Sequence, residues 1–326
     1  MSRRAPSLIA APPGTQDILV PAGFVVRRFA GTLAHTRTLS RPIRVAHLTD
    51  LHVGRVTPAR VFAETVNLTN ALEPDLVVIT GDFVCHSQAY LDLLAATIQG
   101  FAAPVLAVLG NHDYWCGAPE VARALRRGGA ELLDNAHTTL TLHGEKLQVV
   151  GVDDDYTGHA RVERAVKGLS PGVATLGLSH IGEVADALWP HGVPLVLSGH
   201  THAGQVTVAK LHELAIGRVV GHRYVHGLYG QRTVEAGEDG AVYVGAGIGA
   251  AVLPLRVGPR ARREIAIFEL GAAPGHFVEP MVEQLPHPGR APTARKQDAR
   301  LKKVARYRAR RVRRLKALPP ETPSQT

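Results

Sequence analysis

Residues 43–52 read IRVAHLTDLH, a short and mostly apolar run that ends in two side chains able to bind a metal ion, Asp50 and His52. Apolar runs of about five residues are typical of strands that are buried on both faces of a parallel sheet. Similar runs return in residues 76–82, LVVITGD, and in residues 105–113, VLAVLGNHD. We therefore predict that each of the three stretches contains one buried strand.

Helical patterns separate these strands. Thr57 followed by Pro58 is typical of a helix N-cap and a first helical residue, and apolar residues then continue at helical spacing as far as Leu72. Two further helices are predicted over residues 90–98 and 119–127. Strands that alternate with helices indicate parallel βαβ units, so the expected fold class is α/β.

The second half of the chain continues with shorter strand signals. The predicted strands cover residues 139–142, 147–152, 174–179, 195–198, 205–208, 241–244 and 264–270, with a helix over 183–189 and an edge strand within 23–30. Glycine-rich turns separate the last of these strands.

Five of the strands in this pattern are each followed by Asp, Asn or His donors. These donors are Asp50 with His52, then Asp82, Asn111 with His112, His180, and finally His200 with His202. The carboxyl ends of strands that feed one sheet lie along one edge, so we expect the donors to converge there. Carboxylates packed together repel unless a cation lies between them. A mixture of carboxylate and imidazole donors suits manganese, iron or zinc better than calcium.

Together these segments resemble a known set of motifs. Asp50-Leu51-His52, Gly81-Asp82, Gly110-Asn111-His112-Asp113, His180 and Gly199-His200-Thr201-His202 look like the five ordered motifs of calcineurin-like metallophosphoesterases. The resemblance covers about residues 43–270. It departs from the family pattern after His180, where Pro is common, and at Ala203, where Gly is usual.

The resemblance implies an architecture and a division of the chain. The expected fold is a four-layer α/β/β/α sandwich with two mixed sheets and a metal site at the carboxyl ends of the strands. Residues 1–40 would be an N-terminal extension, residues 41–272 the metallophosphoesterase domain, and residues 273–326 a basic, low-complexity tail.

The resemblance also implies a role for each donor and two divalent metal ions as cofactors. The first ion would be bound by Asp50, His52 and His202, the second by Asn111, His180 and His200, and both by Asp82. A hydroxide bridging the two ions would attack phosphorus. His112 would be the catalytic residue that faces the substrate and stabilises charge or protonates the leaving group, with Asp50 or Asp113 as its partner.

The motifs also restrict the range of expected substrates. Protein phosphatases of the superfamily carry G-D-x-V-D-R-G and G-N-H-E, whereas this chain has GDFVCH at 81–86 and GNHD at 110–113, which argues against protein dephosphorylation. The combination resembles a bacterial phosphodiesterase branch, some members of which cleave the pyrophosphate of UDP-2,3-diacylglucosamine in lipid A synthesis. A nucleic-acid phosphodiesterase and a non-catalytic protein that binds membrane or nucleic acid are the alternatives.

The net charge of +9 belongs mainly to the C-terminal tail. Residues 290–326 hold 13 Lys and Arg against two acidic residues, so the rest of the chain is close to neutral. Leu301, Val304, Val312 and Leu315 predict a helix with a thin apolar stripe, solvated or folded only under some conditions. An anionic membrane surface, nucleic acid and plain solvent all suit such a tail.

Other features leave alternatives open. Only two cysteines, Cys85 and Cys116, favour a reducing compartment, and they are either neighbours or two separate buried thiols. Because no apolar run reaches the ~18 residues of a membrane span, we expect a cytoplasmic protein, with contact at the inner membrane as an option. Some side chains could line the cleft or serve only the structure: His47, His86, His222, His226, Tyr114, Trp115 and residues 153–155.

Overall fold

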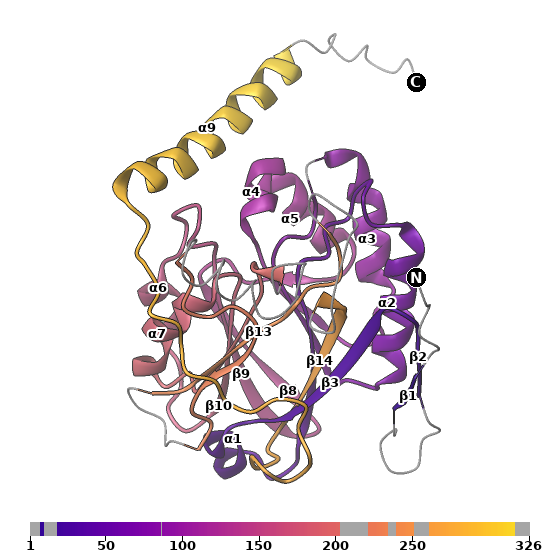
Figure 1. Ribbon diagram of the computed structural model, residues 1–326, viewed down its shortest axis with the longest axis vertical. Coiled ribbons are helices and arrows are strands. Elements are labelled where there is room, and N and C mark those ends of the chain that lie inside the picture. Colours follow the sequence, from indigo (N-terminus) through magenta and orange to yellow (C-terminus); the bar gives the residue numbers. More distant parts are fainter. Residues whose placement is uncertain are drawn as a thin grey trace.

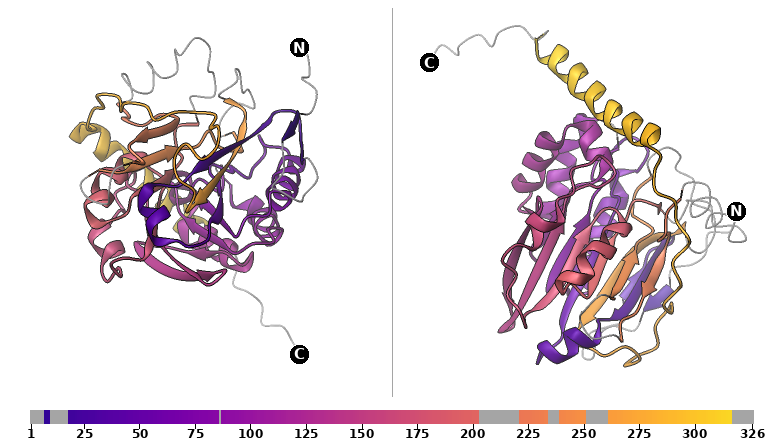
Figure 2. Two further views of the ribbon diagram at one scale, coloured as in Figure 1. Left: turned by 90° about the horizontal axis from the view of Figure 1, so that it is seen from below. Right: turned by 90° about the vertical axis from the view of Figure 1, so that its left-hand side faces the viewer.

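The fold consists of two mixed sheets of six strands each, which lie face to face with helices on both outer sides (Figures 1 and 2). The computed structural model describes residues 7–9, 18–85, 87–202, 221–233, 239–250 and 261–316. The arrangement is a four-layer α/β/β/α sandwich, which confirms the expected fold class.

The first sheet has the strand order β3-β14-β4-β5-β6-β7. Its strands are β3 (Phe24–Ala30), β14 (Arg263–Leu270), β4 (Ile43–Leu48), β5 (Leu76–Thr80), β6 (Val105–Val108) and β7 (Glu131–Leu132). The last four are parallel to one another, whereas β14 runs antiparallel to β4. The helices packed on it are α2 (Ala59–Ala71), α3 (Leu91–Gln99) and α5 (Ala118–Arg127).

The second sheet has the order β12-β13-β11-β10-β9-β8. Its strands are β12 (Gly227–Gly230), β13 (Ala241–Val244), β11 (Leu195–Ser198), β10 (Ala174–Ser179), β9 (Glu145–Val152) and β8 (Ala136–Leu142). The four inner strands are parallel, and the two edge strands are antiparallel to their neighbours. Short helices α6 (Val162–Val166) and α7 (Ala185–Leu188) cover its outer face.

Apart from the last helix, the remaining described elements are short. They are the antiparallel pair β1 (Ser7–Ile9) and β2 (Ile18–Val20), the helices α1 (Leu33–Thr38) and α4 (Asn111–Cys116), and the single turns η1 (Gln88–Tyr90), η2 (Gly182–Val184) and η3 (Trp189–His191).

Alternation along buried strands gives each sheet two apolar faces. In β5, Leu76 and Val78 pack between the sheets, whereas Val77 and Ile79 pack against the helices. Fully burying such a side chain contributes about 1.5–3 kcal/mol. The two sheets are therefore held in a fixed relation, and this relation places the ends of their strands next to each other.

Most strand predictions are confirmed, and two local predictions need correction. The helix after β4 begins at Ala59 with Pro58 as its N-cap, because the Thr57 hydroxyl accepts a hydrogen bond from the Ala250 backbone nitrogen instead. The helix predicted over residues 183–189 is divided into η2, α7 and η3. The strand predicted over residues 205–208 lies outside the described residues.

The segment after β14 returns along the body before the last helix begins. The Gln284 backbone nitrogen donates to the Leu228 carbonyl at 2.8 Å, which attaches this segment to β12. The division at residues 1–40, 41–272 and 273–326 stays a prediction.

The last helix, α9 (Ala294–Lys316), packs against α4 near its start and then projects from the body (Figures 1 and 2). Val304 is only 5% exposed, whereas Leu301 is 48% exposed. The predicted apolar stripe is thus buried at Val304 but not at Leu301. The first turns of this helix are held against the body rather than fully solvated.

Phe268 ties the two sheets together, and its removal should destabilise the fold. Its ring lies 5.2 Å from the ring of Phe29 in the first sheet and 5.2 Å from the ring of Tyr243 in the second. We expect Phe268→Ala to lower the free energy of unfolding by about 3–5 kcal/mol, measured by urea denaturation. The control is Val278→Ala, because Val278 is 99% exposed. Equal urea midpoints for the two variants would contradict this account of the core.

Candidate metal centre

Polar side chains that follow β4, β5, β10 and β11 meet at one end of the sandwich. One group of buried donors comprises Asp50, His52, Asp82 and His202, and a second comprises Asp82, His180 and His200. Within each group the potential ligand atoms all lie within 4.8 Å of one another. The structure therefore brings the sequence-predicted donors together in two groups that share Asp82.

The backbone bends sharply to aim these side chains inward. Five donors have left-handed φ angles although none is glycine: Asp50 (51°), His52 (44°), Asp82 (54°), His200 (74°) and His202 (53°). Such conformations cost on the order of 1–3 kcal/mol each and concentrate at functional sites, where the surrounding structure enforces them. The backbone at these five residues is therefore strained, and this conformation directs their side chains toward the site.

Asp82 points one carboxylate oxygen toward each group. Its Oδ1 lies 3.4 Å from His180 Nε2 and accepts a hydrogen bond from the His112 backbone nitrogen at 2.8 Å. Its Oδ2 lies 3.6 Å from His52 Nε2. A carboxylate has two oxygens and can bind two ions, whereas imidazole or amide donors serve one ion each.

Asp50 is oriented by its neighbours so that one oxygen is left for another partner. Its Oδ2 accepts hydrogen bonds from the Thr49 hydroxyl at 2.7 Å and from the His200 backbone nitrogen at 3.0 Å. Its Oδ1 faces His202 Nε2 at 3.2 Å. Two separate strand ends, one from each sheet, are joined through this carboxylate.

The imidazoles face one another at short range. His52 Nε2 and His202 Nε2 are 2.8 Å apart, and His200 Nδ1 lies 3.3 Å from His180 Nε2. Burial lowers the pKa of His52 and of His200 well below the usual value, so both rings favour the neutral form in which nitrogen can bind a metal. Ring nitrogens that face each other at this range are well placed to bind a cation between them.

His180 shows how strongly this space attracts positive charge. Burial acts to lower its pKa, but the charge of Asp82 and their hydrogen bond outweigh burial and raise the pKa to about 10. Its Nδ1 donates to the Thr80 carbonyl at 2.8 Å, so Nε2 is the atom presented to Asp82. A carbonyl behind the ring is the usual support for an imidazole that binds a metal.

Unpartnered acceptors also fit a cation. Among the described residues, Asp50 Oδ1 and Asn111 Oδ1 are buried atoms that accept no hydrogen bond. Leaving a buried acceptor unsatisfied costs about 1–3 kcal/mol. The chemistry of the donor set, with carboxylate, amide and imidazole groups, therefore fits two divalent ions.

Asp113 fixes the helix that carries Asn111 and His112. Its Oδ1 accepts hydrogen bonds from the backbone nitrogens of Phe83 and Val84, and its Oδ2 accepts one from Gly110. The loop after β5 and the start of α4 are thereby locked together.

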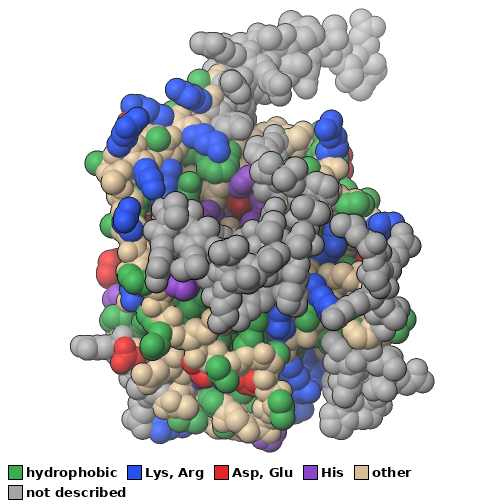
Figure 3. Space-filling model, in the orientation of Figure 1, with side chains coloured by type: hydrophobic (Ala, Val, Ile, Leu, Met, Phe, Trp, Pro, Cys, Tyr) green, Lys and Arg blue, Asp and Glu red, His purple; other side chains and the backbone are tan. Residues whose placement is uncertain are grey.

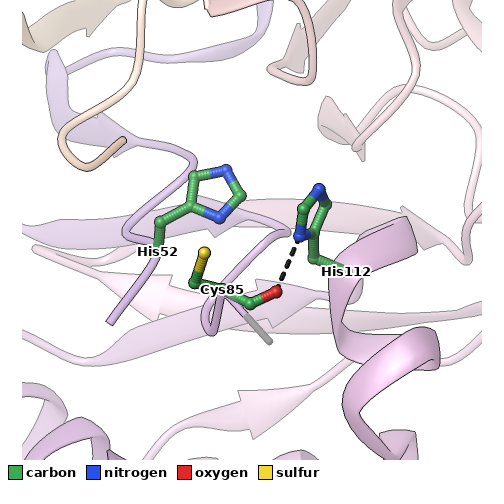
Figure 4. A group of neighbouring side chains, drawn as sticks. All are labelled: His52, Cys85 and His112. Atoms are coloured by element: carbon green, nitrogen blue, oxygen red, sulfur yellow. Dashed lines mark hydrogen bonds between the residues drawn. The ribbon is translucent and has the colours of Figure 1, made fainter. Parts of the chain in front are cut away.

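His112 has a different partner from the carboxylates that the sequence suggested. Its Nδ1 donates to the Cys85 carbonyl at 2.8 Å, and its ring stands edge-on to the His52 ring at 4.8 Å (Figure 4). The predicted pairing with Asp50 or Asp113 is therefore corrected to a backbone carbonyl. Burial and the nearby charge of Asp82 raise the pKa of the Cys85 thiol to about 11, and its sulfur lies in a further group of potential ligands with His52 and His112. Cys85 and Cys116 do not form a disulfide with each other.

The other candidate histidines separate into two kinds. His222 lies beside the site, with its ring 5.2 Å from the His200 ring and its Nδ1 3.0 Å from a Glu183 carboxylate oxygen. His47 and His226 are buried and bond to other side chains below the site, Thr80 and Glu264 respectively. His86 lies outside the described residues.

The aromatic and acidic candidates form part of the wall. Trp115 is buried with its ring 4.7 Å from the His112 ring. The Tyr114 hydroxyl donates to Asp153. Asp153 and Asp154 are buried rather than solvated, although Asp155 in the same run is exposed.

Sequence reasoning missed three contributors to the site. Thr49 orients Asp50, and its only signal was its place next to that residue. Arg300 and Lys303 of α9 reach aromatic residues of the wall. No local pattern announces such contacts, because they join segments far apart in the chain.

Comparison with known proteins agrees with this geometry. The family profile described as calcineurin-like phosphoesterase matches residues 43–204. The chain is 28% identical to the phosphodiesterase YaeI of Escherichia coli over 212 residues, which are 62% of this chain and 76% of that protein. It is 29% identical to the metallophosphoesterase YkuE of Bacillus subtilis over 235 residues, 70% of this chain and 78% of that protein.

A third relative is longer. The chain is 32% identical over 251 residues to a Bos taurus transmembrane protein with a metallophosphoesterase domain, which covers 71% of this chain and 54% of that protein. No described helix of this chain combines the length and apolar character needed to cross a membrane. The family is metal-dependent, and the buried His and Asp cluster suits a dinuclear metal site.

Gly199 lets the two sheets approach closely enough to form the site. A Cβ atom there would lie 1.8 Å from the Thr49 hydroxyl oxygen and 2.5 Å from Asp50 Oδ2. We expect Gly199→Ala to displace Asp50 and to weaken Mn²⁺ binding by about 10–100-fold, the loss typical when a residue that orients a ligand is disturbed. Titration calorimetry with Mn²⁺ measures this effect.

The matched control is Gly144→Ala. A Cβ atom at Gly144 meets nothing within 4 Å, although its φ of +85° adds backbone strain. This variant should lose some stability and keep its affinity for Mn²⁺. The same Mn²⁺ affinity in Gly199→Ala as in the wild type would show that the Thr49–Asp50 contact does not shape the site.

Proposed function

We propose that this chain, which belongs to the calcineurin-like phosphoesterase family and is a hydrolase acting on phosphoester bonds, cleaves phosphodiesters or pyrophosphates at a centre of two divalent metal ions. The observation that carries the proposal is Asp82, which directs one oxygen to each group of donors. No other donor of the site is shared between the two groups.

The proposed ligands follow from the two groups. The first ion would be held by Asp50, His52, His202 and Asp82, and the second by Asp82, Asn111, His180 and His200. We propose Mn²⁺ as the metal, with iron or zinc as the other ions that suit mixed oxygen and imidazole donors. When bound, a pair of such ions makes water a strong nucleophile at neutral pH and neutralises charge on the phosphoryl oxygens.

His112 is proposed as the catalytic acid. Its Nδ1 donates to the Cys85 carbonyl, which orients the ring, and Nε2 would be the atom that passes a proton to the leaving oxygen. The bond from its backbone nitrogen to Asp82 Oδ1 ties its position to that of the shared carboxylate. A proton donor fixed in this way can assist a poor leaving group.

The substrate is proposed to be a diester or pyrophosphate rather than a phosphoprotein. The chain lacks the Arg and Glu of the protein phosphatase motifs at residues 81–86 and 110–113. A relative from Escherichia coli is named a phosphodiesterase. UDP-2,3-diacylglucosamine or another lipid-linked or nucleotide diester is the substrate class that we propose, with nucleic-acid diesters as the alternative.

A membrane surface is proposed as the place of action, at the inner membrane on the cytoplasmic side. Seven Lys and Arg lie in residues 306–326. Val278, Val282 and Leu285, in the segment that leads to α9, are 99%, 77% and 90% exposed. Exposed apolar side chains combined with cations favour an anionic bilayer, because stable attachment to a bilayer takes two such signals. Nucleic acid would use the cations alone.

Turnover should depend on metal and on Asp82. We expect hydrolysis of bis-p-nitrophenyl phosphate with Mn²⁺ and none after EDTA treatment. Asp82→Asn should lower kcat by more than about 100-fold, the order seen when one group that stabilises a transition state is removed. The control is Asp92→Asn, since the Asp92 side chain is 94% exposed. Wild-type turnover in Asp82→Asn would rule out the shared carboxylate, and no turnover with any divalent metal would favour the non-catalytic binding protein.

Truncation after Ala305 tests the membrane proposal without disturbing the site. It removes the seven cations of residues 306–326 but keeps Val304, which anchors α9. At about 1 kcal/mol per basic residue near an anionic surface, binding to phosphatidylserine vesicles should fall by more than about 100-fold. Turnover of bis-p-nitrophenyl phosphate should not change. Unchanged vesicle binding together with weaker binding to duplex DNA would support the nucleic-acid alternative.

A further inference from the structure

Two cations on the first turns of α9 lie beside the metal centre. We propose that Arg300 and Lys303 form a phosphate-binding subsite that selects substrates carrying a second phosphate next to the one that is cleaved. This inference rests on the proposed function, because it assigns the metal centre to the phosphate that reacts. Figure 3 shows histidine and acidic atoms in a hollow, with Lys and Arg side chains along its upper left rim.

Lys303 stands next to the proposed catalytic acid. Its Nζ lies 3.2 Å from the centre of the Trp115 ring, and that ring lies 4.7 Å from the ring of His112. Burial lowers the pKa of Lys303, and the charge of Asp82 acts in the opposite direction. The ammonium group is therefore close enough to the shared carboxylate to feel its charge.

Arg300 stands over the other half of the centre. Its guanidinium carbon lies 3.7 Å from the centre of the Tyr156 ring, and that ring lies 5.1 Å from the ring of His200. Although Asp155 is exposed, the part of its carboxyl that neighbouring groups cover raises its pKa, and the nearby charge of Arg300 acts against that rise. Arg300 keeps a planar face on Tyr156 and can direct its N–H groups to an incoming anion.

The helix holds both cations in position. Residues 300, 303 and 304 share one face of α9, because residues three and four apart are neighbours on a helix. Val304 on that face is 5% exposed, and α9 packs against α4, the helix that begins at Asn111 and carries His112. The subsite and the metal centre are thus fixed relative to each other by one contact between helices.

The pairing of charges distinguishes these two cations from their neighbour Lys302. Within the described part of the chain, neither Arg300 nor Lys303 forms an ion pair with a carboxylate, and each rests on an aromatic ring. Lys302 points elsewhere and pairs with Asp298 at 2.5 Å. Cations held over aromatic rings keep their donors available, and phosphate is the anion that such donors recognise best.

A substrate with two adjacent phosphates would match the two separate sets of positive charge, which are the proposed metal ions and the pair Arg300 and Lys303. The metal centre would neutralise the reacting phosphoryl group, so a monoanionic diester gains nothing further from distant cations. A diphosphate-linked substrate carries another charged phosphate one bridging oxygen away, and this group would meet Arg300 and Lys303. The subsite therefore points to pyrophosphate bonds as the preferred target of the enzyme.

Binding of uridine diphosphate and uridine monophosphate tests the subsite without any need for turnover. Titration calorimetry with Mn²⁺ present would compare wild type, Arg300→Gln, Lys303→Gln and, as the matched control, Lys302→Gln. We expect the preference for the diphosphate to fall about 10-fold in Arg300→Gln and Lys303→Gln, the scale of one charge-assisted hydrogen bond. Lys302→Gln should keep the wild-type preference although it removes the same charge, and Lys303→Arg should restore most of it.

Hydrolysis of bis-p-nitrophenyl phosphate distinguishes a failure of the subsite from a failure of the proposed hydrolase function. Its kcat should fall by a smaller factor in Arg300→Gln and Lys303→Gln than the preference for the diphosphate does, because that ester has no second phosphate to meet the cations, and Lys302→Gln should leave its kcat and KM unchanged. If both variants keep the wild-type preference for the diphosphate, the subsite is wrong while the hydrolase proposal stands. If wild type binds the diphosphate through these cations and yet hydrolyses no ester, the subsite stands and the diesterase proposal is wrong.

Discussion

The site depends on the burial of Asp82 among imidazoles. Its carboxylate is 2% exposed, and its two oxygens face histidines of two different groups. Removing a carboxylate from water is costly unless positive charge compensates for it. Burial acts to raise the pKa of Asp82, but the surrounding histidines outweigh it and hold the pKa well below the usual value. The fold is therefore built around a negative charge that demands cations.

The two sheets meet this demand jointly. β4 and β5 of the first sheet lead to Asp50 and Asp82, whereas β10 and β11 of the second lead to His180 and His200. The hydrogen bond from the His200 backbone nitrogen to Asp50 Oδ2 crosses from one sheet to the other. The side chains packed between the two sheets hold the sheets in this relation.

The sequence was a good guide to features that are local or periodic. Residues 76–80 were predicted as a strand because their apolar run is continuous, and the strand ends predicted the donors that follow. The Thr57 cap was wrong because a distant backbone nitrogen, that of Ala250, competes for its hydroxyl. The predicted partner of His112 was wrong for a similar reason, since its Nδ1 bonds to the backbone carbonyl of Cys85, which lies 27 residues away in the chain. Contacts between residues that are far apart in the chain do not change the spacing of apolar residues, so this spacing cannot predict them.

The position of the basic residues in the fold could not be predicted from the sequence either. The net charge of +9 is concentrated after residue 290, and the sequence suggested only a solvated or surface-binding tail. In the fold, the first turns of α9 pack against α4, so Arg300 and Lys303 lie near the metal centre, and the helix then projects from the body. In the two proposals above, one helix would then bind both the second phosphate of the substrate and an anionic surface. An anionic surface would draw the projecting half toward it, and this would bring the hollow with its metal centre close to diphosphate-linked lipids embedded there. Under the membrane proposal, the basic residues of the tail would therefore favour a substrate that is presented at a surface.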